Sequence, residues 1–435
     1  MQITIEKLIF GGQGFARVDG QPSPDGLRPA SIVYFVWNAL PGEVVEIEIL
    51  KKKKEYIEAV ATKIINPSPF RVEPKDAHFL STSPWQIMSY EKENEWKKEI
   101  ALEVYKRIGK EAFAEVNPEL IFDVEKYYSY RNKMEFSFAV DKTGRTCLGF
   151  FERGKRDKFA VEKSELADDA INETSVYILA WVRKHQIPMR SLKSLMVRSD
   201  GNGKTIAALF IKDRLEFPDF PELNDQMIGF QLYYSTHKSP ASVPTDTLYT
   251  KGQDYIIVTL RGIEFKVGLL SFFQVHLPVF EKALDDIYEY IPKKANLLDL
   301  YSGVGSIGLP VAGRAKQVTL VDNNTEAIQY ATENILLNKI KNADAICKPT
   351  ENILELITSD SVVILDPPRI GLHHRVVEKI LETKPKTIIY LSCDLSTQAR
   401  DIFLLHPAYK ISFSRLYNFF PRTPHIEGLC VLSLE

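Results

Sequence analysis

The chain has 435 residues, 45% of them hydrophobic and 26% charged, which is enough apolar surface to bury the cores of about two to four domains. This composition excludes a disordered chain, a collagen and a small disulfide-stapled scaffold. The formal net charge is −2, from 55 basic and 57 acidic residues, so any surface for a polyanion must come from local clusters of basic residues.

The N-terminal 65 residues have the pattern of a small all-β barrel. Short strand-like segments are separated by turns rich in glycine and proline. Asn66-Pro67-Ser68-Pro69 then interrupts regular structure and predicts a linker. The predicted strands are Gln2–Ile9, Ile32–Val36, Val44–Leu50 and Tyr56–Ile64.

Residues 66–260 predict a mixed α+β domain. Apolar residues recur every four positions from Trp96 to Ile108, which predicts one amphipathic helix over Tyr90–Phe113 with a solvated polar face. The other predicted elements of this region are strands at Tyr130–Val140, Leu195–Arg198, Thr205–Ile211 and Ile228–Ser235, and a helix at Val176–Arg183.

Residues 261–435 alternate short apolar runs with helical stretches, which indicates βαβ units and a largely parallel sheet. In such sheets ligands bind beyond the carboxyl ends of the strands. The residues that directly follow each apolar run are therefore the candidate site residues. The runs are Leu297–Leu300, Gln317–Val321, Ser361–Leu365 and Thr387–Leu391.

The first run leads into a glycine-rich turn, Tyr301–Gly308, of the form G-x-G-x-x-G. Asp322 lies 19 residues beyond Gly303, at the end of the next strand, where a carboxylate can accept hydrogen bonds from both ribose hydroxyls. Dinucleotide-binding folds and S-adenosylmethionine folds share this feature, so at this point both cofactors remain open, as does a purely structural turn.

The third run ends in Asp366-Pro367-Pro368-Arg369. Two prolines fix the backbone and hold the preceding carboxylate rigidly at the strand end. Methyltransferases commonly carry such an element where the methyl acceptor meets S-adenosylmethionine, although a stiff turn is the simpler interpretation.

Two further side chains have reactive and structural interpretations. Cys393 follows the fourth run and precedes a helix capped by Asp394 or Ser396, where a helix N-terminus would favour the thiolate; a buried filler is the alternative. Glu427 begins an apolar strand, Leu429–Leu434, and is costly to bury unless it is used; a surface carboxylate is the alternative.

Three other segments are candidates for binding. Phe272-Phe273-Gln274 combines aromatic rings with an amide, although paired phenylalanines usually lie in a core. The densest basic clusters are Lys51–Lys54 and Arg153–Arg156. Each is either a phosphate-binding site or a solvated surface patch.

The ordered motifs D-L-Y-S-G-V-G, D-P-P-R, S-C-D-L-S-T-Q-A-R-D and F-P-R-T-P-H-I-E resemble those of the S-adenosylmethionine-dependent RNA uracil-5-methyltransferases. The N-terminal G-G-Q-G-F-A-R and A-L-P-G-E resemble a TRAM domain, a small OB-like RNA-binding barrel. The resemblance implies three domains: a TRAM-like barrel at 1–65, a mixed α+β domain at 66–260 and a Rossmann-like class I methyltransferase domain at 261–435.

The resemblance also implies roles for individual residues. Cys393 is expected to be the nucleophile and Glu427 the base that removes the C5 proton. The expected cofactor is S-adenosylmethionine, in a pocket with contributions from Gln274, Tyr301, Asp322 and Asp366.

Many members of this family hold an iron–sulfur cluster on four cysteines. Here Asp76, Thr82, Trp85 and Ser164 stand at the corresponding positions. The four cysteines of the chain, Cys147, Cys347, Cys393 and Cys430, include no C-x-x-C pair. We therefore predict no iron–sulfur cluster and no other metal.

The predicted function is the formation of 5-methyluridine in structured RNA, with 23S ribosomal RNA as the first choice of substrate and the transfer-RNA T-loop as the alternative. Two alternatives come from other classes, an NAD-dependent dehydrogenase and a non-catalytic RNA-binding protein. The sequence contains neither a signal peptide nor 18 consecutive apolar residues, so we expect a cytoplasmic monomer without membrane or DNA partners.

Overall fold

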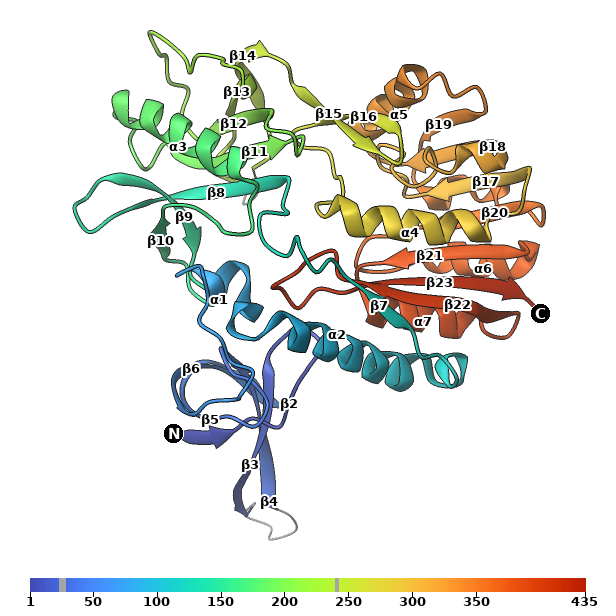
Figure 1. Cartoon of the computed structure of the whole chain (residues 1–435), viewed down its shortest axis with the longest axis horizontal. Helices are drawn as coiled ribbons and strands as arrows, with labels where there is room; N and C mark the ends of the chain where they lie inside the picture. The colour runs from blue at the N-terminus through green and yellow to red at the C-terminus, as the bar shows by residue number, and fades with distance from the viewer. Residues whose placement is uncertain (23–28, 239–241) are drawn as a thin grey trace. The chain divides into compact units, whose positions relative to one another are not determined.

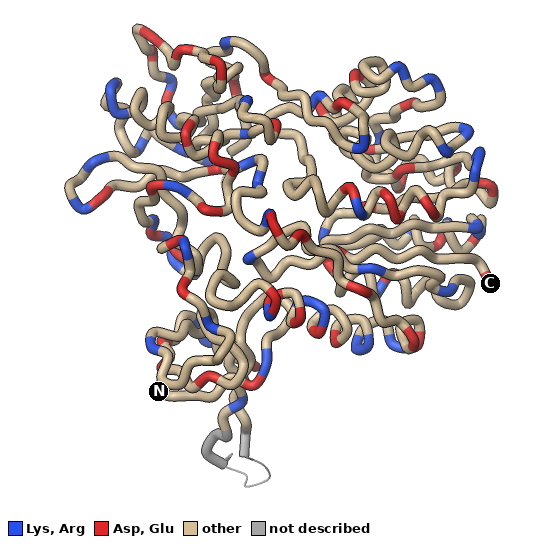
Figure 2. The backbone as a smooth tube through the Cα atoms, in the orientation of Figure 1, with Lys and Arg blue, Asp and Glu red and all other residues tan. Residues whose placement is uncertain are grey.

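The computed structural model describes residues 1–22, 29–238 and 242–435 (Figure 1). The chain forms two compact units. One consists of Met1–Glu103, Phe150–Phe159 and Phe420–His425, and the other of Val104–Gly149, Ala160–Phe419 and Ile426–Glu435. Within the described ranges, no helix has the length and apolar character needed to cross a membrane. Figure 2 shows basic and acidic residues interspersed along the chain.

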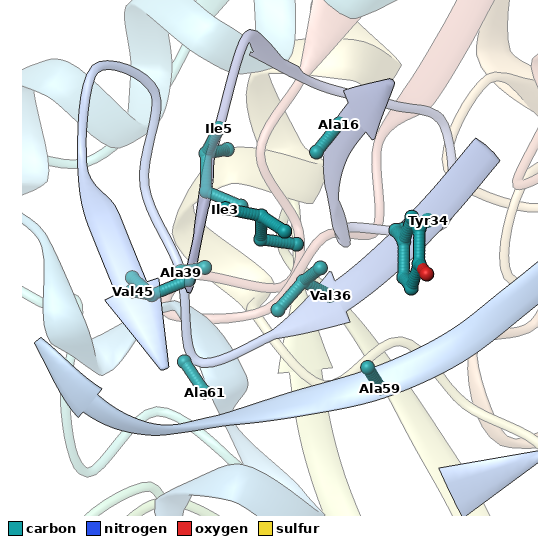
Figure 3. Packing of buried hydrophobic residues seen from close by; sticks show 9 residues of the cluster. All are labelled: Ile3, Ile5, Ala16, Tyr34, Val36, Ala39, Val45, Ala59 and Ala61. Atoms are coloured by element: carbon teal, nitrogen blue, oxygen red, sulfur yellow. The ribbon is translucent and has the colours of Figure 1, made fainter. Parts of the chain in front are cut away.

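The first unit contains a six-stranded sheet with the order β1-β5-β6-β4-β3-β2. Figure 3 shows nine residues of its core, of which all but Ile5 and Ala39 lie on strands. On β4, the buried Tyr34 and Val36 alternate with the more exposed Phe35. The predicted strand Gln2–Ile9 is divided in two, and β3 was not predicted because its glycine-rich start had the pattern of a turn. The strands are β1 (Gln2–Thr4), β2 (Lys7–Leu8), β3 (Gly14–Pro22), β4 (Pro29–Trp37), β5 (Val44–Lys52) and β6 (Tyr56–Asn66).

The helix predicted over Tyr90–Phe113 is α-helical only as α2 (Tyr90–Val104). A π turn (Tyr105–Gly109) and a 3-10 turn (Lys110–Phe113) follow it. The short helix α1 (Phe79–Thr82) and a 3-10 turn (Pro84–Ile87) precede it.

The predicted solvation of the polar face of α2 is wrong for Glu93 and Lys97, whose side chains are fully buried. Glu93 pairs with Lys97 at 3.1 Å and with the Arg422 guanidinium at 3.1 Å, and it also accepts the Arg422 backbone N–H at 2.9 Å. Burial lowers the pKa of Lys97 to about 8 in spite of this carboxylate. The periodicity of apolar residues cannot reveal these ion pairs, because Arg422 lies more than 300 residues away in sequence.

A seven-stranded sheet has the order β10-β9-β8-β11-β12-β13-β14. Helix α3 (Asp169–Lys184) begins at Asp168, whose carboxylate accepts the Ala170 N–H, and packs against β11 and β12. The predicted strand Thr205–Ile211 is found with the same bounds, and the other three predicted strands are found with shifted ends. The strands are β8 (Lys133–Val140), β9 (Thr146–Phe151), β10 (Lys158–Val161), β11 (Leu192–Ser199), β12 (Thr205–Ile211), β13 (Met227–Tyr234) and β14 (Asp246–Gly252), and the hairpin β15 (Tyr255–Leu260) and β16 (Ile263–Gly268) follows them.

The predicted parallel sheet is present in the second unit, as part of an eight-stranded sheet of order β19-β18-β17-β20-β21-β23-β22-β7. All residues of β20 are buried, as expected for a central strand covered on both faces. The chain order reverses at β17, which is the position where ligands bind in open α/β sheets. The strands are β7 (Glu119–Ile121), β17 (Ala295–Leu300), β18 (Ala315–Asp322), β19 (Ala343–Cys347), β20 (Ser361–Leu365), β21 (Thr387–Ser392), β22 (Tyr409–Tyr417) and β23 (Glu427–Leu434).

Four helices accompany this sheet: α4 (Leu277–Tyr290), α5 (Thr325–Leu337), α6 (His374–Thr383) and α7 (Leu395–Leu405). Helix α5 packs on β18 and β19, and α7 packs on β21 and β23. Strand β7 lies within the predicted middle domain, residues 66–260, yet it pairs with β22 at the edge of the eight-stranded sheet. The predicted domain limits 1–65, 66–260 and 261–435 remain a proposal.

Candidate active site

The carboxyl ends of four parallel strands form one edge of the eight-stranded sheet. Leu300 pairs with Val321 on one side and with Leu365 on the other, and Leu365 pairs with Tyr390. Four of the six predicted site residues follow these strand ends or lie at them: Tyr301, Asp322, Asp366 and Cys393.

Glu427 reaches the same edge because β23 runs antiparallel to β21. Ser392 pairs with Gly428, so Cys393 and Glu427 are the next two residues along this register and face each other where the ladder ends. Glu427 is 3% exposed, whereas Cys393 is partly exposed. The structure therefore brings the two predicted reactive side chains together.

The helix that follows Cys393 does not provide the thiolate stabilisation that we predicted. Asp394 is the N-cap of α7, and its Oδ1 accepts the N–H groups of Ser396 at 3.0 Å and Thr397 at 3.1 Å. Two of the free donors at the helix N-terminus are thus used by a carboxylate.

Electrostatics in this site favour protonated groups. Burial raises the pKa of Cys393 to about 12, and the neighbouring Glu427 and Asp366 add to this effect. Burial also raises the pKa of Glu427 well above its ordinary value, with a further contribution from Asp366, whose own pKa burial raises to about 7. Arg369 opposes these shifts by its charge and by a side-chain hydrogen bond to Cys393.

Arg369 is therefore a further candidate site residue, to which the sequence analysis gave no role. Its signal was present in the D-P-P-R motif as a cation directly after the two prolines. It matters because, of the four groups coupled here, it alone lowers the pKa of the Cys393 thiol.

The glycine-rich turn after β17 has the geometry expected of a cofactor loop. Tyr301 has φ of +65° and Gly303 of +55°, both in the left-handed region that L side chains rarely adopt. Asp322 accepts the Gly303 N–H at 2.9 Å on one carboxylate oxygen and the Asn324 N–H at 2.8 Å on the other. It is only partly buried, so its remaining lone pairs are available to ribose hydroxyls.

Asp299 is a second candidate site residue that we did not assign, although it begins the D-L-Y-S-G-V-G motif. It is fully buried, and its Oδ2 accepts the Gly308 N–H at 2.9 Å. Burial raises its pKa to about 8, since that one hydrogen bond does not offset the loss of solvation.

Three buried polar atoms have no hydrogen-bond partner in the described part of the chain: Asp299 Oδ1 and Ser302 Oγ at the end of β17, and Gln274 Oε1 in the segment between β16 and α4. Buried polar atoms are rarely left unpaired unless a ligand or water completes them. The residues present therefore fit a polar ligand such as S-adenosylmethionine. Of the two phenylalanines before Gln274, Phe273 is buried, but Phe272 is 67% exposed and is not a core residue.

Comparison with known proteins identifies the kind of enzyme. Residues 97–434 match the family of tRNA (uracil-5-)-methyltransferases. The chain belongs to this family. Residues 1–62 match the TRAM domain. These matches confirm the resemblance seen in the motifs, and with it the enzyme class, a methyltransferase that uses S-adenosylmethionine, rather than a dehydrogenase or a non-catalytic binding protein.

Individual relatives agree over nearly their whole length. An uncharacterized RNA methyltransferase of Bacteroides thetaiotaomicron is 31% identical over 93% of this chain and 97% of its own. Another uncharacterized RNA methyltransferase, from Caldanaerobacter subterraneus, is 28% identical over 98% of this chain and 96% of its own. The crystal structure of Pyrococcus abyssi tRNA (uracil-54, C5)-methyltransferase in complex with S-adenosyl-L-homocysteine superposes with a TM-score of 0.79 and 23% identity, covering 99% of this chain and 100% of that one. That superposition confirms the predicted multidomain α/β and α+β fold class.

A buried side-chain amide links the two strands at whose ends Cys393 and Glu427 lie. Gln398 on α7 donates to the Tyr390 carbonyl at 2.9 Å and the Gly428 carbonyl at 2.8 Å, and its Oε1 accepts the Tyr105 hydroxyl at 2.8 Å. Gln398 thereby joins β21 to β23 close to Cys393 and Glu427.

Three of the four positions named above for cluster cysteines, Asp76, Thr82 and Trp85, lie in the first unit, where their side chains are hydrogen-bonded. His78 contacts Asp76 at 3.2 Å and Thr82 at 2.9 Å, and Gln86 donates to Asp76 at 2.7 Å. Trp85 donates its indole N–H to the Gly12 carbonyl at 3.0 Å. In the described ranges, no group of three or more His, Cys, Asp or Glu side chains has a metal-binding arrangement. The absence of an iron–sulfur cluster stays a prediction.

Proposed function

We propose that this methyltransferase makes 5-methyluridine through a transient covalent bond between Cys393 Sγ and C6 of the target uracil, with 23S ribosomal RNA as the substrate. The observation that supports this reaction best is the register of β21 and β23, which aligns Cys393 with Glu427 at the strand ends.

Each of the two residues meets one chemical requirement. Uracil C5 is a weak nucleophile, so the Cys393 thiolate first adds to C6, and the electrons of the C5–C6 double bond move toward O4 as an enolate. C5 then bonds to the methyl group that bound S-adenosylmethionine would supply, as the bond from that methyl group to sulfur breaks and S-adenosylhomocysteine is left. Glu427 then takes the proton from C5, the double bond re-forms, and the thiolate leaves C6. Because burial favours the protonated form of Glu427, this step uses the ionised fraction of the residue, and the raised pKa makes that carboxylate a stronger base for the proton.

The residues that would hold the donor are those of the strand edge. Asp322 accepts from ribose hydroxyls, and Gln274 offers its unpaired Oε1. Tyr301 and Asp366 complete the pocket, since they follow neighbouring strands.

The choice of ribosomal RNA rests on the TRAM domain, which the dedicated bacterial transfer-RNA branch of the family generally lacks. Transfer RNA is the second candidate, because the matching family and the Pyrococcus abyssi enzyme both carry transfer-RNA names. A flipped-out uridine costs least in a loop, and both RNAs offer such loops. The predicted cytoplasmic location and monomeric state remain predictions.

Incubation of the purified protein with S-adenosylmethionine and either 23S ribosomal RNA or transfer-RNA transcripts tests the substrate. We expect mass-spectrometric mapping to find 5-methyluridine at one defined position of the ribosomal RNA. Modification of transfer RNA alone would reverse the choice of substrate, and the absence of 5-methyluridine from both would refute the proposed reaction.

Replacing uridine by 5-fluorouridine in the accepted transcript tests the covalent step. Because C5 then carries fluorine instead of a removable proton, elimination stops and the protein stays bound to RNA in a denaturing gel. Cys393→Ala should give no such band. A band of wild-type intensity from Cys393→Ala would exclude this residue as the nucleophile.

A further inference from the structure

A pocket of about 240 Å³ lies in the first unit, and it shares no residue with the Cys393 site. Its walls come from three strands of the TRAM domain, through Trp37 of β4, Leu50 of β5 and Val60 of β6, together with residues of α1 and of the loop between β9 and β10. This volume is below the usual range for drug-sized ligands and suits a single aromatic base.

The Arg153 guanidinium lies over the Trp37 ring in the wall of this pocket. The guanidinium carbon of Arg153 lies 3.9 Å from the centre of the Trp37 ring. The guanidinium donates to the carbonyls of Leu80 and Ser81, and the Arg153 backbone N–H donates to Ser81 Oγ at 2.9 Å, which fixes its orientation. Guanidinium planes and aromatic rings are the groups on which proteins stack unpaired RNA bases.

The two basic clusters identified in the sequence meet beside this pocket. Lys51–Lys54 directly follow Leu50, and a Cβ added at Gly154, within Arg153–Arg156, would lie 3.5 Å from Leu50 Cδ1. Residues 48–58 and 152–158 together contain eight basic and five acidic residues, a net charge of +3, whereas the whole chain has −2. Phosphates are attracted to such a local excess of positive charge.

We propose that this pocket binds one unpaired nucleotide of the RNA, with its base stacked on the Arg153–Trp37 pair and its flanking phosphates on the two basic clusters. The carboxylates of Glu48 and Glu152 also line the pocket. Lys155 donates to Glu152 Oε2 at 2.7 Å, so Glu48 is the hydrogen-bond acceptor that favours a base with an exocyclic amino group, such as adenine, over uracil. The inference rests on the proposed function only in taking RNA as the partner.

Binding of a fluorescein-labelled nine-nucleotide oligoadenylate, followed by anisotropy at several salt concentrations, tests the proposal. Arg153→Lys retains the charge but loses the planar guanidinium on which the base would stack. We therefore expect about tenfold weaker binding with an unchanged salt dependence. The double variant Lys155→Gln/Arg156→Gln should weaken binding and reduce the slope of log K against log salt by about two.

Lys142→Gln/Arg145→Gln is the matched control, because it removes the same charge from the exposed turn between β8 and β9. It should bind oligoadenylate as the wild type does. The proposal is overturned if this control loses as much affinity as Lys155→Gln/Arg156→Gln, or if an oligoglutamate peptide competes as well as unlabelled oligoadenylate. Lys155 and Arg156 are exposed, so their replacement tests the site even if Arg153→Lys does not fold.

Oligoadenylate contains no uridine, so this measurement is independent of catalysis. Normal methylation of a uridine transcript with no effect of Arg153→Lys on oligoadenylate affinity would refute the pocket alone. Pocket-dependent binding of oligoadenylate without methylation of any transcript would refute the proposed reaction alone.

Discussion

The thiol of Cys393 is a weak nucleophile in the resting protein. Burial raises its pKa to about 12, and Glu427 and Asp366 reinforce the shift. Only the thiolate attacks carbon, and at pH values below the pKa the thiolate fraction increases about tenfold for each unit by which the pH rises. We therefore expect the single-turnover methylation rate to rise with pH between about 6 and 9 wherever attack on C6 is the slow step. A rate independent of pH over this range would show that another step limits turnover.

Arg369 is the group that favours the Cys393 thiolate, so its charge should control this rate. In Arg369→Gln the pKa of Cys393 rises further, and we expect single-turnover methylation to fall by about 10- to 100-fold, which corresponds to one or two pKa units. Arg369→Lys keeps a positive charge and should retain more of the rate. Equal losses in both variants would indicate that Arg369 acts through its shape. The affinity for S-adenosylmethionine, measured separately, shows whether donor binding is unaffected.

Glu427 acts after methyl transfer in the proposed reaction, so its removal should have a different signature from that of Cys393. Glu427→Gln can form the bond to C6 and accept the methyl group, but it cannot remove the C5 proton. We expect a covalent complex with ordinary uridine RNA on a denaturing gel and a loss of turnover of about 100-fold or more. Cys393→Ala should give no complex with the same RNA. Fast turnover by Glu427→Gln would assign the base to another group.

Helix α2 shows how an element can combine exposed and buried charges. Glu93 is buried beside Lys97 and Arg422, whereas Glu95 is exposed and pairs with Lys92. Removing one member of a buried ion pair leaves its partners uncompensated, so Glu93→Gln should lower the free energy of unfolding by about 3–5 kcal/mol. Glu95→Gln on the same helix should change it by about 1 kcal/mol or less. Urea titrations followed by circular dichroism measure both, and similar values would contradict the assignment of a structural role to Glu93.

The strands of the catalytic sheet illustrate what the sequence could predict at the scale of elements. Apolar runs such as Ser361–Leu365 can be recognised as strands from the sequence, because central parallel strands are buried on both faces and are therefore apolar throughout. Cys393 and Glu427 could be assigned from their motifs, but not placed together. Their proximity depends on the antiparallel pairing of β23 with β21, and register is a tertiary property that no local pattern encodes. Arg369 and Asp299 escaped assignment for a related reason, since their importance depends on burial and on neighbouring charges.

At the scale of the molecule, sequence order and spatial organisation differ. Phe150–Phe159 and Phe420–His425 belong to the same compact unit as Met1–Glu103, and β7 joins a sheet whose other strands begin at residue 295. Contacts between such distant segments cannot be inferred from periodicity or turn signals. The pocket lined by Trp37 and the basic residues beside it depend on such contacts. Lys51–Lys54 and Arg153–Arg156 are about 100 residues apart in sequence and meet only in the folded chain.

The second compact unit, which contains Cys393 and Glu427, also buries carboxyl groups whose titration should affect the stability of the protein. Burial raises the pKa of Asp299 to about 8 and that of Asp366 to about 7. A carboxyl with a raised folded-state pKa binds its proton more tightly when folded, so its contribution is complete below the unfolded pKa of about 4 and is lost as pH rises through the folded value. We therefore expect stability to fall between about pH 5 and 8.

Asp299→Asn tests this expectation, because the amide cannot lose a proton and can still accept the Gly308 N–H. The fall in melting temperature from pH 5.5 to 8.5 should be smaller in Asp299→Asn than in the wild type by about 3 °C or more. Asp360→Asn removes the same charge from an exposed turn and should follow the wild-type curve. If Asp299→Asn and the wild type lose stability in parallel, Asp299 is ionised in the folded protein at neutral pH, and its buried charge must then be balanced by a group beyond the Gly308 N–H.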